Sequence, residues 1–481
     1  MNIRTAWTLL FATSIAACGG GGGGSEPPPV TSGIDARGAP RVDVAAKGKV
    51  SGFGSVIVNG VRYDTSNTNF DIDGQAGSES DLAVGQVVTV VGSTDDSGGD
   101  ARADSIEYDD LVEGPVESID LPGNSLIVLG QTVLVDTDTI FDDDFSPRDI
   151  TGVSVGQIVE VSGFRNSAQA IRATYIDLDD DSDDFDIYGE VSNVDTAAFT
   201  FDIGSLTVDY SNAMLEDFPN GEPENGQTVD VEGTLGSGGV LLATEVSYED
   251  DDLSDLDGDD IEIEGFITRF ASATDFDVDG TPVTTTGDTS FENGSAADLA
   301  LDVLVEVDGE VNAEGVIVAE EIEFEQEANL AFRGIVEATT DTSVTLLGVT
   351  ATVTAKTDFV DSSSAGLDRF SLADVNVGDY VEVRGFESDG TITLKGLERE
   401  DDVGESGVSG PVSDASPPVF VVAGVTVRTS AATEFEDDDD NPIDSATFFA
   451  NALGNEVEVT GQYANGGLDA AEVEFDTDGN D

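Results

Sequence analysis

The side chains that most enzymes use for chemistry are scarce in this chain of 481 residues. Histidine is absent, which excludes imidazole metal sites and Ser-His-Asp or Cys-His catalysis. The single cysteine, Cys18, lies near the N-terminus, so the chain can form no internal disulfide. Carboxylates remain, with 100 Asp plus Glu against 18 Lys plus Arg. Their chemistry would be the binding of hard cations such as calcium, or the hydrolysis of glycans by an acid and a nucleophile.

The net charge of −82 restricts the partners that the chain can have. Such a field repels DNA, RNA and anionic lipid surfaces, so we expect no nucleic-acid partner. The same field attracts divalent cations, and it leaves a glycan or another protein open as a partner. Hydrophobic residues still make up 39% of the chain, which indicates a folded protein rather than an acidic disordered tail.

Two acidic runs are the strongest candidates for calcium ligands, because calcium binds carboxylate and carbonyl oxygens. Both runs lie where one sequence repeat, described below, gives way to the next. The predicted ligands are Asp177, Asp179, Asp180, Asp181, Asp183, Asp184, Asp250, Asp251, Asp252, Asp257 and Asp259. The alternative is that the runs are solvated linkers kept extended by self-repulsion. Asn69 to Gly74 begins like an EF-hand loop but has Ser80 at the closing position, so we interpret it as a strand and a turn.

The N-terminus resembles that of a bacterial lipoprotein. Residues 1–17 combine a basic Arg4 with an apolar run too short to span a bilayer, and Ile15-Ala16-Ala17-Cys18 resembles a lipobox. The resemblance implies cleavage before Cys18 and lipidation of its thiol, which would anchor the chain to a membrane. Gly19 after the cysteine favours the outer membrane, on its periplasmic or its external face. Residues 18–47 are predicted to form a flexible tether. The alternative is a plain signal peptide with an incidental cysteine.

The residues described so far must be positioned by a unit that recurs six times. Its clearest element is a strand of alternating valine and polar residues, such as VGQIVEVSG from Val155 to Gly163, which we expect to end in a glycine turn. The glycines that close this strand are Gly92, Gly163, Gly233, Gly309, Gly385 and Gly461. A G-x-V strand opening, a hairpin glycine such as Gly130, a T-x-F triplet and an A-x-x-I strand complete the unit.

Each unit holds five predicted strands, with a short helix or loop between the third and the fourth. That order favours an all-β tandem array of six small five-stranded antiparallel OB-like barrels, arranged as separate domains. The alternative is a single six-bladed propeller. In the last unit, Ser445 is predicted to cap the helix and Gly454 to end it. The predicted domains are residues 48–110, 111–180, 185–252, 261–327, 329–401 and 403–476, followed by an acidic tail at 477–481.

The repeated pattern resembles a bacterial family known only as domain of unknown function 5666, found in tandem in secreted proteins and lipoproteins. The resemblance covers residues from about 48 to 476, and it implies no known reaction, so no catalytic residue can be carried over. OB-type barrels often bind extended polymers across the second and third strands. Arg62, Tyr63, Phe201 and Tyr210 lie on or near that hairpin. We interpret them as packing residues, because they do not recur between units.

We therefore expect a non-enzymatic, lipid-anchored protein of the cell envelope that acts as a binding or structural module and is stiffened by calcium. Its partners would be the membrane, through the anchor, together with divalent cations and a glycan or a protein. The alternative is a carboxylate-dependent hydrolase of envelope glycans, which would depend on one unique pair of carboxyl groups in one repeat.

Overall fold

The computed structural model describes residues 41–95, 101–179, 184–249, 260–367, 369–388, 390–437 and 441–475. The lipobox-like segment, the tether up to residue 40 and the acidic tail lie outside these residues. The end of the predicted tether is part of the first strand, which begins at Arg41. Within the described ranges, no helix is long and apolar enough to cross a membrane.

Repeat one shows the barrel that every unit builds. Its strands are β1 (Arg41–Gly52), β2 (Val56–Val58), β3 (Val61–Asp64), β4 (Asn69–Ile72), β5 (Gln75–Gly77), β6 (Val87–Asp95) and β7 (Ala101–Tyr108). β1 pairs with β2, β2 with β3, β3 in parallel with β7, β7 with β6, and β6 with β1 again. Five strands thus close into a barrel, which confirms the predicted OB-like fold.

The other repeats follow the same order. Repeat two comprises β8 (Val112–Asp120), β9 (Ser125–Val128), β10 (Gln131–Leu134), β11 (Ile140–Phe141), β12 (Ile158–Arg165) and β13 (Ile171–Leu178). Repeat three comprises β14 (Phe185–Asp195), β15 (Thr200–Ile203), β16 (Leu206–Asp209), β17 (Met214–Glu216), β18 (Thr228–Leu235) and β19 (Val240–Glu249). Repeat four comprises β20 (Asp260–Ser272), β21 (Asp275–Val278), β22 (Thr281–Glu292), β23 (Leu304–Val311) and β24 (Ile317–Phe324).

Repeats five and six complete the array. Repeat five comprises β25 (Leu330–Ile335), β26 (Ala338–Thr340), β27 (Ser343–Leu346), β28 (Val349–Thr352), β29 (Asp358–Asp361), β30 (Tyr380–Ser388) and β31 (Thr391–Glu400). Repeat six comprises β32 (Ser406–Ser416), β33 (Val419–Val422), β34 (Val425–Arg428), β35 (Glu434–Glu436), β36 (Glu456–Ala464) and β37 (Gly467–Phe475).

The predicted helix of repeat six is α1 (Ser445–Asn451). Its N-cap is Asp444 and not the predicted Ser445, because the Asp444 carboxylate accepts a hydrogen bond from Thr447 N at 2.7 Å. Gly454 follows the helix with a φ of 84°, a left-handed conformation that suits glycine. The same segment holds a single 3₁₀ turn in repeats one, two and five, at Glu79–Asp81, Ile150–Gly152 and Leu372–Asp374.

The recurrent glycine lies inside its strand. In repeat two the register of β12 against β13 shifts at Gly163, which marks a β-bulge, and the strand continues to Arg165. A Cβ on Gly163 would lie 2.1 Å from the carbonyl oxygen of Arg172. The predicted glycine turn is wrong, because the close approach of the next strand at the bulge is what requires glycine. The same register shift occurs at Gly92, Gly233, Gly309, Gly385 and Gly461.

The T-x-F triplet is tied to the same bulge. Thr139 Oγ1 donates to the carbonyl oxygen of Ala173 at 2.8 Å, and Ala173 is the residue that pairs with Gly163. Four other repeats make the equivalent bond, through Thr68, Thr289, Thr357 and Thr433. Patterns that lie far apart in the repeat therefore meet at one place in the barrel.

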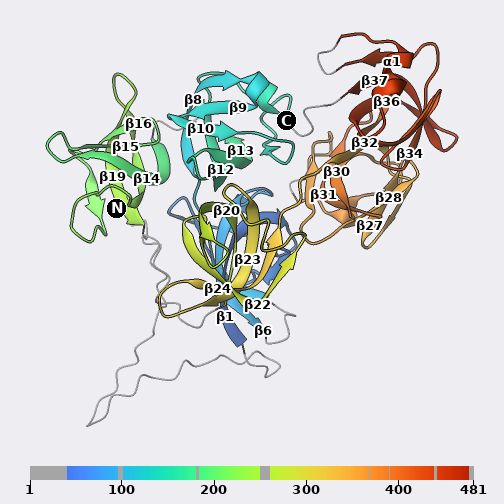
Figure 1. The fold of residues 1–481 in the computed structure, drawn as a ribbon. Coiled ribbons are helices and arrows are strands. Elements are labelled where there is room, and N and C mark those ends of the chain that lie inside the picture. The colour runs from blue at the N-terminus through green and yellow to red at the C-terminus, as the bar shows by residue number, and fades with distance from the viewer. Residues whose placement is uncertain are drawn as a thin grey trace.

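The barrels join edge to edge in three pairs (Figure 1). In each repeat, the first half of the first strand has a hydrogen-bonding edge that no strand of its own barrel occupies. Two repeats join when these edges of their first strands pair with each other. β1 pairs in parallel with β20, whereas β8 pairs with β14 and β25 with β32 in antiparallel fashion. Repeat four therefore joins repeat one, which is not its neighbour in sequence. The expectation of separate barrels on a string is wrong, because shared sheets connect them.

The pairs also pack on one another. Figure 1 shows repeats one and four, in blue and yellow, below the pair of repeats two and three and beside the pair of repeats five and six. Repeat five also contacts repeat two directly, through Lys395 and Asp138. Val87 N on β6 donates to Ser162 Oγ on β12 at 2.8 Å, beside a small apolar contact of Val87, Phe164 and Phe266. Repeats two and three share one hydrophobic core, and so do repeats five and six.

We predict that Gly163→Ala destabilises repeat two, whereas Gly287→Ala leaves the array unchanged. The methyl group at Gly163 would overlap the Arg172 carbonyl, while a Cβ at Gly287 would meet nothing within 4 Å. Overpacking of this kind costs about 1–3 kcal/mol. Hydrogen exchange in urea should show earlier opening of β12 and β13 in Gly163→Ala alone. Equal opening in the two variants would contradict the role given to the bulge.

Candidate functional site

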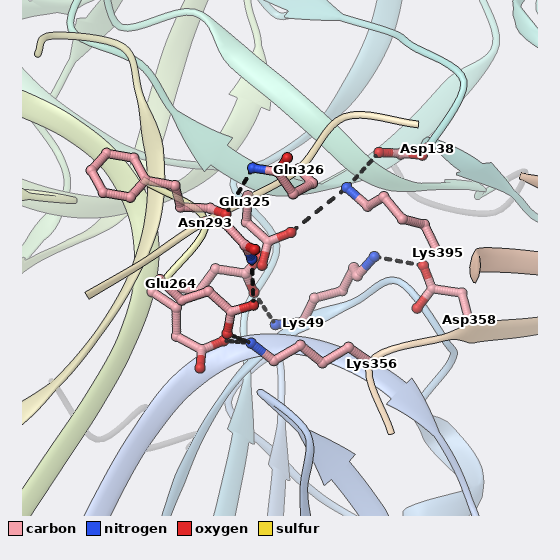
Figure 2. A network of polar contacts seen from close by, with 12 residues as sticks. Lys49, Asp138, Glu264, Asn293, Glu325, Gln326, Lys356, Asp358 and Lys395 are labelled. Carbon is pink, nitrogen blue, oxygen red and sulfur yellow. Dashed lines mark hydrogen bonds and ion pairs between the residues drawn. The ribbon is translucent and has the colours of Figure 1, made fainter. Parts of the chain in front are cut away.

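Repeats one, two, four and five meet around a cavity of about 400 Å³. Its wall includes Lys49, Lys356 and Lys395, and the one other lysine of the chain, Lys47, pairs with Asp279 across the interface of repeats one and four. Each ammonium group comes from one repeat and contacts a carboxylate of another. Figure 2 shows the network around the three lysines of the cavity. The concentration of three of the four lysines around this cavity makes it the first candidate for a functional site.

Lys356 neutralises a row of carboxylates on repeat four. Glu264 on β20 lies opposite Glu306 on β23, which lies opposite Glu323 on β24, and we call these residues the repeat-four row. Like charges at facing positions destabilise a sheet. Lys356 Nζ, from repeat five, lies 2.8 Å from Glu306 Oε2 and 2.5 Å from Glu323 Oε2. The neighbouring repeat thus supplies the cation that this row needs.

Lys49 and Lys395 connect repeats one and two to repeat five. Lys49 Nζ lies 2.6 Å from Asp358 Oδ2, and Lys395 Nζ lies 3.0 Å from Asp138 Oδ2. Burial opposes the protonation of Lys49. The negative charges of Asp358 and other nearby carboxylates outweigh this effect and raise the pKa of Lys49 above its ordinary value. Burial also opposes the ionisation of Asp138, yet Lys395 and Lys49 lower its pKa to about 2. Lys49 is therefore a charged cross-link and not a neutral amine that could act as a nucleophile.

The structure places three of the predicted calcium ligands, Asp177, Asp179 and Asp184. Asp177 lies on β13 with Asp179 just after it, and Asp184 directly precedes β14. The other predicted ligands, Asp180, Asp181, Asp183, Asp250, Asp251, Asp252, Asp257 and Asp259, lie outside the described residues. Of the three that are placed, Asp179 groups with two further carboxylates.

Those two carboxylates are Glu113 and Glu160, which sequence analysis missed. The carboxylate oxygens of Glu113, Glu160 and Asp179 lie within 4.8 Å of one another. Glu160 lies between the buried residues Val159 and Val161, and Glu113 follows the buried Val112 and precedes Gly114, so neither stands out as part of an acidic run. The feature of the sequence that could have identified them is their position, because both occupy outward-facing places of the repeated strands. Asp142, Asp143 and Asp144 form a second group, mostly exposed.

The hairpin residues singled out in the sequence serve packing or local bonding. Tyr63, Phe201 and Tyr210 are buried in the barrel cores. Arg62 is exposed, and its Nη1 donates to the carbonyl oxygen of Gly54 at 3.0 Å. The segment that begins like an EF-hand loop is β4 followed by a turn, as expected.

The buried carboxyl groups predict a loss of stability as the pH rises. Burial raises the pKa of Glu107 and of Glu400 to about 7, and that of Glu306 to about 9. These folded-state values exceed the unfolded ones, so the stability they contribute is present below about pH 4 and is lost as the pH rises through the folded values. In chelator, the unfolding temperature should fall between about pH 5 and pH 8. A constant or rising unfolding temperature would contradict the raised pKa values.

Comparison with known proteins assigns the repeat. No curated protein matches the chain at a significant level. The family described as Domain of unknown function (DUF5666) matches residues 47–107, 113–177, 188–247, 264–323, 333–393 and 409–474. Each match begins in the first strand of one barrel and ends in its last strand, so the family's unit and the barrel coincide. The chain belongs to the DUF5666 family, as a protein with six tandem copies of its domain.

Proposed function

We propose that this protein is a non-enzymatic, lipid-anchored component of the cell envelope that acts as a rigid binding or structural scaffold. The observation that carries the proposal is that all four lysines pair with a carboxylate of another repeat, three of them around one cavity. Barrels that share sheets in pairs and are tied by partly buried ion pairs have little freedom to swing. Such an array holds six barrel surfaces at fixed positions, which suits a scaffold.

The chemistry of the junction supports a role without catalysis. A glycan hydrolase, the alternative, needs one protonated carboxyl and one ionised carboxylate that both face the substrate. Glu306 is the candidate for the acid, because burial raises its pKa. Its Oε2, however, is held by Lys356, which also holds Glu323. The carboxylates here are committed to joining repeats rather than to a substrate.

The sequence outside the described residues supports the proposed location in the cell envelope. The lipobox-like segment before Cys18 favours an anchor in the outer membrane, on either face. The net charge of −82 favours divalent cations, together with a glycan or a protein, as partners and disfavours nucleic acid. Divalent cations drawn into this field would stiffen the array further.

Replacing Cys18 should release the protein from the membrane. We expect the unaltered chain and the control Ser25→Ala to incorporate a palmitate analogue and to sediment with membranes. Cys18→Ser should do neither, because it lacks the thiol that would carry the lipid. Membrane association of Cys18→Ser equal to that of the control would reject the anchor.

Removing the Lys356 ammonium should loosen the array. Breaking a buried ion pair costs about 3–5 kcal/mol, and less here because the Lys356 side chain is 34% exposed. Lys356→Met should increase the radius of gyration in small-angle scattering and should expose the segment between repeats four and five to proteases. Arg428→Met is the matched control, because Arg428 pairs with Asp469 inside repeat six. An unchanged radius and cleavage pattern in Lys356→Met would reject the rigid scaffold.

A further inference from the structure

Two of the β-bulges lie beside the same cavity. Opposite the bulge glycines Gly163 and Gly385, one residue of the next strand is left without a pairing partner, Thr174 in repeat two and Lys395 in repeat five. Both residues line the cavity of about 400 Å³ around which repeats one, two, four and five meet. A bulge turns its extra side chain out of the regular alternation of the strand. Repeats two and five therefore use equivalent bulges to place side chains in one cavity.

The residue that follows the bulge glycine is a phenylalanine in these two repeats alone. Phe164 and Phe386 hold this place, and both line the cavity. The corresponding residues of the other repeats are Ser93, Thr234, Glu310 and Gln462. Leu304 and Leu394 add further apolar surface to the wall. A departure from the repeated pattern therefore gives the cavity two aromatic side chains.

The charged side chains of the wall are already paired with one another. The basic side chains that line the cavity each contact a carboxylate, and they are Lys49, Lys356, Lys395 and Arg172. Five of the six carboxylates on the wall contact one of these basic groups. The sixth, Glu264, accepts a hydrogen bond from Lys49 N at 3.1 Å. An ionic ligand would have to separate one of these partly buried pairs, which is costly, so the cavity suits a neutral ligand.

A ligand rich in hydroxyl groups matches this wall. A hydroxyl both donates and accepts hydrogen bonds, so it can contact the carboxylate and the ammonium group of one pair without a charge of its own. Thr174 Oγ1 is buried and has no hydrogen-bond partner among the described residues. The C–H groups on the face of a sugar ring are slightly positive and the face of a phenyl ring is negative, so the two attract each other. The cavity volume also lies within the range of small-molecule sites, about 300–1,000 Å³.

We propose that this cavity binds a neutral sugar, either one hexopyranose ring or a disaccharide. Phe164 and Phe386 contact the apolar face of the sugar, while Thr174 and the ion pairs of the wall bond its hydroxyl groups. The proposal rests on the binding role proposed above and names the ligand and its place. The site lies between barrels, and it is distinct from the surface of strands two and three through which single OB-type barrels often bind polymers.

Titration of the full chain with neutral and charged sugars, followed by saturation-transfer difference NMR, tests the ligand class. The neutral probes are glucose, N-acetylglucosamine, cellobiose and N,N′-diacetylchitobiose, and we expect at least one of them to bind with a Kd of about 1 mM or less. Glucosamine and glucuronate keep the same ring but carry a positive and a negative charge. Each should bind at least about tenfold more weakly than the best neutral probe. Absence of binding by every neutral probe, or tighter binding of a charged one, would overturn the proposal.

Matched substitutions test the place of the site. Thr174→Val removes the hydroxyl and keeps the shape, and it should weaken the binding of the best probe about tenfold. Thr244→Val is its control, because Thr244 is the extra residue of the same bulge in repeat three and does not line the cavity. Phe386→Ala should weaken binding at least about tenfold, whereas Phe199→Ala, at an exposed ring of repeat three, should not.

Equal effects of Thr174→Val and Thr244→Val would show that the sugar binds elsewhere, and that result would overturn the site. The radius of gyration in small-angle scattering should be the same for all four variants. This measurement separates the loss of a sugar site from the loss of the rigid array, which Lys356→Met tests.

Discussion

The constraint on which this structure depends is the neutralisation of carboxylates that face one another across its sheets. The repeated strands place acidic residues opposite one another at outward-facing positions, as Glu264, Glu306 and Glu323 show in repeat four, and Lys356 of repeat five contacts this face. In a chain with a net charge of −82, few basic side chains are available to neutralise these carboxylates. The chain places all four lysines at contacts between repeats, where each ammonium group pairs with a carboxylate of another repeat. The relative placement of the barrels is therefore an electrostatic matter as much as a hydrophobic one.

The fold of one unit could be predicted from the sequence, because its signals are local. Alternating valines indicated strands, and hairpin glycines such as Gly130 indicated tight turns, here with a φ of 73°. The role of Gly163 could not be predicted in the same way. A glycine at a turn and a glycine at a bulge look alike in sequence, and only the Arg172 carbonyl on the next strand distinguishes them.

Which barrels pair with one another could not be predicted from the sequence, for a different reason. Every repeat has the same free edge on its first strand, so the local pattern allows any two repeats to join. The choice of β20 as the partner of β1 depends on contacts between side chains from distant repeats, such as Lys47 with Asp279. The same holds for the candidate sites. Acidic runs between repeats drew attention in the sequence, whereas the grouped carboxylates include Glu113 and Glu160, which are strand residues that meet only after pairing.

The repetition also allows the six barrels to be compared with one another. Six copies of one barrel provide an internal comparison in which the backbone is constant and only the charge at each place changes. Lys47, Glu113 and Arg333 occupy one place in three repeats, and the sign of the charge at that place differs between the repeats. In a protein whose shared pattern encodes only the barrel, individual function must lie where a copy departs from the pattern. The departures that the structure shows are gathered where repeats meet.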